Sequence, residues 1–351
     1  MYINTFNHCP NTRYQGSKRR LTPWLFDVFS KLEFDSCLDL FGGTASVSYL
    51  LKTMGKSVTF NDYLTSNSIT SRGIIQNNSV RLYPGDVNSL FEINNHTDIV
   101  SEVFSGIFFT DEENLQIDNL IYNINFNKKT SLTGFKKDIA LHSLFQSLLM
   151  KRPFNLFHRA NLYLRTNDVK RSFGNKKTWD TPIKELMERI RLEINSAIFN
   201  NGKNHQVFNL DALEVKSGFD LVYLDPPYYA QDKHSPLDYY EYYHFLEGLS
   251  NYNSWKSKID YNRKHRPILK KDASFKSVSF IDDLTTLLSA HQESIIVMSY
   301  KSPGYPSIEK LKDIMEETHK KPYIYSKEHT YSLNKNNGHY LENLIVASPK
   351  C

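Results

Sequence analysis

The chain is poor in cysteine. Its 351 residues include only Cys9, Cys37 and Cys351, which are scattered and lack the spacing of metal ligands. So few thiols are typical of a reducing compartment, and they argue against a disulfide framework or a zinc site. We therefore expect a cytoplasmic protein that needs no metal.

Long apolar runs are also missing. No stretch approaches the roughly 18 residues that a membrane-spanning helix needs, and the N-terminus contains no apolar signal core. The sequence thus predicts no membrane partner. Its formal net charge of +5 is compatible with a nucleic-acid partner but does not establish one.

Seven short runs of apolar, β-branched and aromatic residues predict β-strands. They lie at residues 36–40, 57–60, 207–210, 219–224, 294–298, 323–331 and 341–347. The first two are joined by a tight turn and by a helical stripe from Val47 to Met54. A strand–turn–helix–strand unit of this kind implies a parallel sheet.

The composition changes between the two groups of strands. Residues 81–204 show mainly helical patterns, including a capping box at Thr110 and Glu113. We therefore predict an α/β fold in which residues 1–80 and 205–351 build a sheet of about seven strands. The intervening residues would form an inserted, mainly helical domain.

A run of four residues, Asp225-Pro226-Pro227-Tyr228, directly follows the predicted strand at 219–224. The carboxylate would lie at the carboxyl edge of the sheet, where α/β proteins bind ligands. The two prolines remove backbone N–H donors and leave carbonyl groups free to accept hydrogen bonds. A carboxylate, a stiff turn and an aromatic ring together suit the binding of an amino group on a flat heterocycle.

Another candidate site follows the first predicted strand. Gly42 and Gly43 would let the backbone approach a ligand, although a plain tight turn gives the same pattern. Asp62 ends the next strand, about 20 positions after the glycines, a spacing typical of an acidic residue that binds ribose hydroxyls. Asp211 ends the strand before Asp225, and it is either a helix cap or a ligand for a base amino group.

Four motifs follow one another along the chain: residues 14–18 (YQGSK), residues 39–48 (DLFGGTASVS), Asn61-Asp62, and residues 225–228 (DPPY). In this order they resemble the Dam-type, D12-class (alpha-group) DNA adenine-N6 methyltransferases. The resemblance covers roughly residues 13–80 and 205–350. It departs from the family at Ser17, where a second glycine is common, but serine is similarly small.

The resemblance implies a Rossmann-like, S-adenosylmethionine-dependent methyltransferase sheet with an inserted DNA-recognition domain. By the same resemblance, the cofactor-binding residues are Tyr14, Lys18, Asp39, Phe41, Gly42, Gly43, Asp62 and Asp211. Tyr14 and Lys18 match positions near the cofactor or the DNA backbone. Asp62 would bind the ribose hydroxyls, and Asp211 the adenine amino group of the cofactor.

The expected substrate is adenine in duplex DNA. Its N6 amine is a poor nucleophile, because the lone pair is delocalised into the ring. Asp225 and the Pro226 carbonyl could accept its two hydrogens and free that lone pair. With Pro227 and Tyr228 they form the predicted catalytic set. The base must flip out of the helix to reach them, and Tyr228 would stack on it.

The inserted region carries a basic cluster with interleaved aromatic residues. Such a pattern suits phosphate contacts and base-pair wedging, although a solvated basic surface gives the same signal. The predicted DNA-binding residues are Lys151, Arg152, Arg159, Arg165, Lys170 and Arg171. Residues 229–243, rich in tyrosine, form either a loop over the flipped base or a packed aromatic helix.

Other activities stay open on the sequence alone. Methylation at cytosine C5 needs a nucleophilic cysteine, commonly after proline, whereas the only Cys–Pro neighbours here are Cys9 and Pro10 in the reverse order. N4-cytosine methylation, RNA adenine methylation and a non-catalytic DNA-binding relative remain as alternatives. An adenine methylase could serve restriction–modification beside a separate cognate endonuclease, or act as an orphan or phage enzyme.

Overall fold

The computed structural model describes residues 6, 8–94, 97–130, 132–168, 176–230, 238–269, 273–329 and 340–350. The chain divides into two compact units. A helical unit contains residues 1–17, 64–201 and 239–271, and a sheet unit contains residues 18–63, 202–238 and 272–351. The predicted insertion therefore lies in the helical unit, apart from its last three residues. No helix in the described ranges combines the length and apolar character needed to cross a bilayer.

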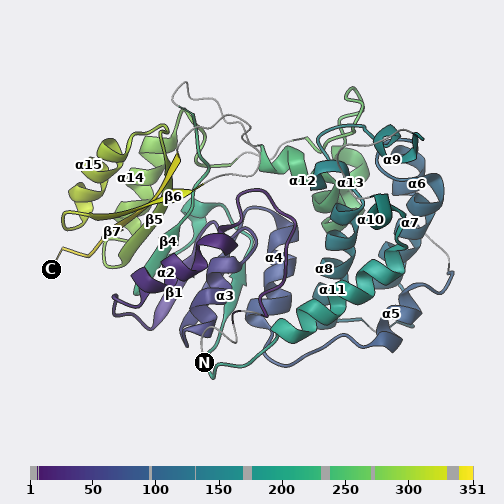
Figure 1. Cartoon of the computed structure of the whole chain (residues 1–351), viewed down its shortest axis with the longest axis horizontal. Helices are drawn as coiled ribbons and strands as arrows, with labels where there is room; N and C mark the ends of the chain where they lie inside the picture. The colour runs from purple at the N-terminus through teal and green to yellow at the C-terminus, as the bar shows by residue number, and fades with distance from the viewer. Residues whose placement is uncertain are drawn as a thin grey trace. The chain divides into compact units, whose positions relative to one another are not determined.

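The sheet unit contains a seven-stranded sheet in the order β3-β2-β1-β4-β5-β7-β6 (Figure 1). Its strands are β1 (Ser36–Asp39), β2 (Ser57–Asn61), β3 (Gln206–Phe208), β4 (Leu221–Leu224), β5 (Ile295–Ser302), β6 (Tyr323–His329) and β7 (Tyr340–Ala347). The first five run parallel, and β7 pairs antiparallel with both β5 and β6. The predicted number of strands is confirmed. The sheet is mixed because the last hairpin runs back against β5.

Helices cover both faces of this sheet. Leu38, Val222 and Ile296 share one core with α14 (Phe280–Ala290) and α15 (Ile308–Thr318). On the opposite face, α2 (Thr22–Phe29) packs with α3 (Ser46–Thr53), and the ring of Phe29 meets Tyr223 edge-on at 5.9 Å (Figure 1). Burial on two faces explains why the central strand β4 (LVYL) has no charged residue and is buried along its whole length.

The strand order reverses between β1 and β4. From β1 the chain builds outward through β2 to β3, and from β4 it builds the other way to β5. In sheets of this type, ligands bind outside the carboxyl ends of the strands at such a switch point. The turn after β1 and the Asp225 turn after β4 both lie there.

The helical unit is built around α8 (Gly134–Met150), which packs against α4, α7 and α11. Its other described helices are α4 (Thr65–Ser71), α5 (Pro84–Leu90), α6 (Ile99–Val103), α7 (Asp111–Asn125), α9 (Tyr163–Thr166), α10 (Lys176–Asp180), α11 (Ile183–Ala197), α12 (Tyr239–Ser250) and α13 (Tyr252–Trp255). The predicted capping box begins α7: the Glu113 N–H donates to Thr110 Oγ1, and the Thr110 N–H donates to Glu113 Oε2.

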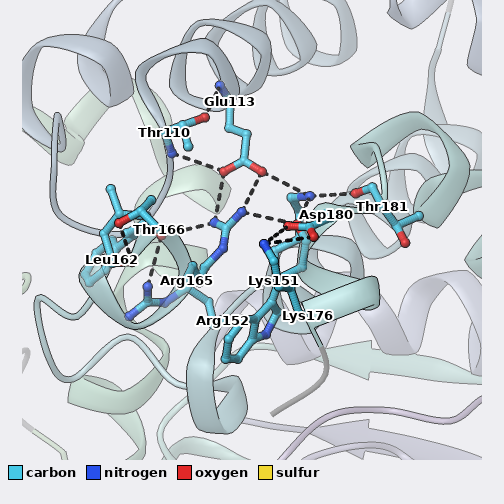
Figure 2. Close-up of polar contacts among 12 residues, drawn as sticks. Thr110, Glu113, Lys151, Arg152, Leu162, Arg165, Thr166, Lys176, Asp180 and Thr181 are labelled. Atoms are coloured by element: carbon cyan, nitrogen blue, oxygen red, sulfur yellow. Dashed lines mark hydrogen bonds and ion pairs between the residues drawn. The ribbon is translucent and has the colours of Figure 1, made fainter. Parts of the chain in front are cut away.

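The same Glu113 carboxylate neutralises buried cations in this unit (Figure 2). Arg165 donates to both of its oxygens at 2.9 and 2.8 Å, and Lys151 Nζ lies 3.0 Å from Oε1. Lys151 also donates to the carbonyl oxygens of Trp179 and Thr181, each at 2.6 Å. This ion-pair cluster joins α7 and α8 to the segment around α9 and α10.

Three residues predicted to bind DNA are therefore interior. Lys151, Arg152 and Arg165 are 2%, 1% and 8% exposed. Arg152 donates to the carbonyl oxygens of Phe108, Leu156 and Arg159 and to the Asn161 side chain. The expectation that these three contact phosphate is corrected, because their charged groups are buried and hydrogen-bonded within the helical unit.

The cluster generates a prediction about stability. Replacing Glu113 with Gln would leave two buried cations without their anion, and breaking a buried ion pair in this way costs about 3 to 5 kcal/mol. We expect Glu113→Gln to lower the free energy of unfolding by that amount in urea titrations. Glu112→Gln is the matched control, since its side chain is exposed on the same turn. Equal stability of the two variants would contradict the role given to Glu113.

Candidate active site

The turn after β4 holds the predicted catalytic residues beside a buried lysine. Lys18 Nζ lies 2.8 Å from each carboxylate oxygen of Asp225. The same ammonium donates to Tyr228 Oη at 2.8 Å and lies 4.9 Å from the centre of that ring. Tyr228 Oη in turn donates to Asp225 Oδ1 at 2.5 Å. The fold thus brings Lys18 into direct contact with residues that follow it by more than 200 positions.

Glu342, on β7, belongs to this cluster although no sequence pattern identified it. Its side chain is fully buried, and Oε1 lies 3.3 Å from Lys18 Nζ. The same oxygen accepts a hydrogen bond from Ser299 Oγ at 2.6 Å and lies 3.2 Å from Tyr228 Oη. The available signal was a lone carboxylate in an apolar strand, since a charge buried in a sheet needs a partner.

Burial and charge pairing oppose each other in the cluster. Burial raises the pKa of Asp225 above its ordinary value, although Lys18 acts to lower it. For Lys18, burial favours the neutral amine, but the carboxylates of Asp225 and Glu342 outweigh it and raise the pKa well above its ordinary value. Lys18 is therefore a cation at neutral pH, and Asp225 is a carboxylate with an enhanced affinity for a proton.

The glycine turn after β1 is held by Asp62. The Gly43 N–H donates to Asp62 Oδ2 at 2.8 Å, and Gly43 has a positive φ of 50°. A Cβ atom on Gly42 would lie 2.1 Å from the ring of Phe60, so packing against β2 alone requires glycine there. The tight turn is therefore explained without a ligand, and Asp62 has a structural role at the end of β2.

Asp39 ends β1 and is almost fully buried. Its Oδ2 accepts hydrogen bonds from the Ser48 backbone N–H at 3.0 Å and from Ser48 Oγ at 2.6 Å. Its Oδ1 is buried and has no hydrogen-bond partner among the residues that the structure describes. Burial raises the pKa of Asp39 to about 7, and the nearby charges of Asp225 and Asp62 add to the effect. A buried, unsatisfied acceptor at a ligand-binding edge is a place for a donor from a ligand.

Asp211 caps the short turn Ala212–Glu214 and lies half-buried. Its Oδ1 accepts from the Leu213 N–H at 3.0 Å and from Ser274 Oγ at 2.6 Å, and its Oδ2 accepts from the Ser274 N–H at 2.8 Å. This is the capping role that the sequence offered as one alternative. Phe41 meets Phe275 edge-on at 5.0 Å beside the same core.

The predicted motif at residues 14–18 is divided between the two units. Tyr14 lies in the helical unit, where its ring stacks on Tyr239 and Tyr243 at centroid distances of 5.5 and 4.5 Å. Tyr243 is buried, and its Oη accepts a backbone hydrogen bond from the motif. The tyrosines of α12 thus form a packed aromatic helix. Residues 231–237 of the same segment lie outside the described residues.

Of the predicted DNA-binding residues, Arg159 is the one that the structure describes as exposed. Lys170 and Arg171 lie outside the described residues. Arg159 follows Phe154, whose ring is 54% exposed and whose φ of 62° places it in the left-handed region. Both belong to the loop that the buried Arg152 guanidinium holds by its carbonyl oxygens.

The arrangement at the switch point can bind a cation and an amine. The carboxyl groups of Asp39, Asp62 and Asp225 interact electrostatically, which favours a positively charged ligand among them. Asp225 is also the first residue of a turn that contains two prolines and therefore lacks two backbone donors. A planar amine placed there would meet hydrogen-bond acceptors.

Comparison with known proteins agrees with this geometry. The family model for D12 class N6 adenine-specific DNA methyltransferases matches residues 14–296. The chain is similar to the type II methyltransferase M2.HphI of Haemophilus parahaemolyticus, with 24% identity over 92% of this chain and 93% of that protein. It is also similar to the type II methyltransferase M.NlaIII of Neisseria lactamica, with 25% identity over the same shares of the two chains.

Proposed function

Because the chain belongs to the D12 class of N6 adenine-specific DNA methyltransferases, we propose that it methylates N6 of an adenine flipped out of duplex DNA. The methyl donor would be S-adenosylmethionine. The observation that carries the proposal is the contact of Lys18, Asp225 and Tyr228 at the switch point of the sheet. It supports the proposal because the Asp225 carboxylate, which would bind the amine, follows the strand next to β1.

The residues around that turn fit the cofactor. S-adenosylmethionine supplies an electrophilic methyl group on a positively charged sulfur, and it also carries an ammonium group. The acidic edge formed by Asp39, Asp62 and Asp225 suits these charges. The unsatisfied Oδ1 of Asp39 would accept a hydrogen bond from the ammonium. Asp62 would bind the ribose hydroxyls of the cofactor, and Asp211 would accept a hydrogen bond from its adenine amino group. Each carboxylate would either keep its present hydrogen bonds within the protein or exchange them for bonds to the cofactor.

Asp225 prepares the adenine amine. Its carboxylate would accept one N6 hydrogen and the Pro226 carbonyl the other, which draws the lone pair out of conjugation. Holding the two reacting atoms in line accounts for most of the expected acceleration. The methylated amine must then lose a proton. Asp225 can receive it, because burial raises the pKa of this carboxyl group.

Recognition of duplex DNA is proposed for the loop around residues 153–161. Its exposed Phe154 and Arg159 would supply an aromatic surface and a phosphate-binding cation. The buried Arg152 would hold the loop in shape rather than contact DNA. Since the two named relatives are type II methyltransferases, we also propose a role in restriction–modification beside a separate endonuclease.

The first test concerns the product and Asp225. With labelled S-adenosylmethionine and duplex DNA, acid hydrolysis should yield N6-methyladenine. Asp225→Ala should lower turnover by at least about 100-fold, because general acid–base groups contribute 10²- to 10⁴-fold, while DNA affinity stays close to that of the wild type. Asp313→Ala, exposed on α15, is the control and should keep full activity. Labelled N4-methylcytosine, or no transfer by the wild type, would refute the proposal.

The second test concerns Asp39 and pH. Its pKa of about 7 means that it is mostly protonated at pH 5.5 and ionised above pH 7. If the ionised form binds the cofactor ammonium, affinity for S-adenosylmethionine should rise about tenfold between pH 5.5 and 7. Calorimetric titration of Asp39→Asn should show weaker and nearly pH-independent binding over this range. The same pH dependence in both proteins would remove Asp39 from the cofactor site.

The third test concerns the DNA contact. Removing one phosphate contact lowers the slope of log affinity against log salt by about one. We expect this change for Arg159→Ala in binding titrations at several salt concentrations. Lys310→Ala removes an exposed cation from α15 and should leave the slope unchanged. Identical slopes for Arg159→Ala and the wild type would exclude a phosphate contact by Arg159.

A further inference from the structure

The cluster around Asp225 contains one more carboxylate than its lysine needs. Lys18 already lies 2.8 Å from both oxygens of Asp225, and yet the fully buried Glu342 also approaches the ammonium, at 3.3 Å. Burying a second carboxylate is unfavourable unless it has partners. Glu342 has them in Ser299 Oγ and Tyr228 Oη. The fold therefore maintains a second anion beside Lys18.

Donors already occupy most of the carboxylate of Asp225, whose side chain is 17% exposed. Both of its oxygens contact Lys18 Nζ, and Oδ1 also accepts the hydroxyl proton of Tyr228. An adenine amine needs a free acceptor on the same carboxylate. A carboxylate has about four acceptor sites, so these three contacts leave one for the amine, on Oδ2. Lys18 and Tyr228 still draw on the charge that would polarise the amine, so Asp225 acts on the base more strongly once it gives up at least one of these donors.

Releasing Lys18 from Asp225 would be costly without a second anion. Its side chain is only 6% exposed, and a buried ammonium that loses its partner is strongly destabilised. Glu342 already lies 3.3 Å from Nζ and 3.2 Å from Tyr228 Oη. A small displacement would let the ammonium and the phenol both donate to Glu342 while Asp225 turns to the amine.

We propose that Glu342 is a positioning residue that receives Lys18 and Tyr228 when Asp225 engages the adenine amine. This inference rests on the proposed function. Glu342 reaches the reaction only through those two side chains. A purely structural Glu342 would instead link β7 to β5 through Ser299, and the loss of that link would reduce stability alone.

The inference has a consequence for pH dependence. The charged and titratable groups around Asp225 are Lys18, Glu342, Tyr228, Tyr223 and Asp39. Lys301 pairs with Glu342 across β5 and β7; burial lowers the pKa of Lys301, and the charge of Glu342 acts to raise it. The negative charge of Glu342 disfavours a second one on Asp225 and so holds the pKa of Asp225 up. A neutral amide at position 342 lets Asp225 ionise at lower pH.

The test compares Glu342→Gln with the wild type in steady-state methylation of duplex DNA from pH 5 to 9. The expected result is a fall in kcat of at least about tenfold with KM values for DNA and S-adenosylmethionine within about twofold. The acidic limb of the pH–kcat profile should also move to lower pH. Glu328→Gln, an exposed change on β6, should leave both unchanged.

Three outcomes would overturn the inference while leaving the proposed function intact, provided that the wild type forms N6-methyladenine. They are a normal kcat, a loss of kcat with an unmoved acidic limb, and a loss that follows the thermal melting point alone. If Glu342→Gln does not fold, Ser299→Ala replaces it. Ser299→Ala keeps the negative charge of Glu342 but removes the hydrogen bond that holds its carboxylate. We therefore expect kcat to fall while the acidic limb of the pH–kcat profile stays in place. An unchanged kcat for Ser299→Ala would equally refute the role.

Discussion

The buried ammonium group of Lys18 joins the start of the sheet unit to the turn after β4 and to β7. Lys18 precedes the first strand, Asp225 follows β4, and Glu342 lies in β7, so their contact needs both ends of the chain in one sheet. A buried cation with two buried carboxylates has few favourable arrangements. The cluster therefore fixes the turn after β4 relative to β7 and to the segment that begins at Lys18. The position of the Asp225 carboxylate, which we propose binds the amine, depends on this electrostatic constraint.

Charge has a different use in the helical unit. There Lys151 and Arg165 share Glu113, and Arg152 holds the carbonyl oxygens of a loop. These buried cations hold surface segments in place through hydrogen bonds and ion pairs. Of the residues predicted to bind DNA, Arg159 is the described one that this loop leaves exposed, together with the ring of Phe154. A basic run in sequence therefore does not equal a basic surface, because an arginine with five donors also suits the binding of backbone carbonyls.

Sequence patterns predicted the elements that short-range physics determines. The seven strands, the capping box at Thr110 and the turn before α3 depend on periodicity and local hydrogen bonds. Glu342 was not predicted, because its role arises from partners more than 40 positions away. The burial of Lys151 and Arg165 was missed for the same reason: Glu113 lies far from both in sequence. The fold decides which charged residues pair inside a protein, and the neighbouring residues in the sequence do not.

The net charge of the site suits the proposed reaction. Asp225 and Glu342 flank Lys18, and Asp39 and Asp62 add further carboxyl groups close to Asp225 or to each other, so acidic groups outnumber the described cations Lys18 and Lys301 there. Methyl transfer moves positive charge from sulfur to the adenine nitrogen, and a proton then leaves. An acidic, preorganised site stabilises that charge at both positions. The same surplus of carboxylates gives Lys18 an anion whenever Asp225 is occupied. Cofactor binding, amine activation and proton release would then depend on one shared electrostatic environment.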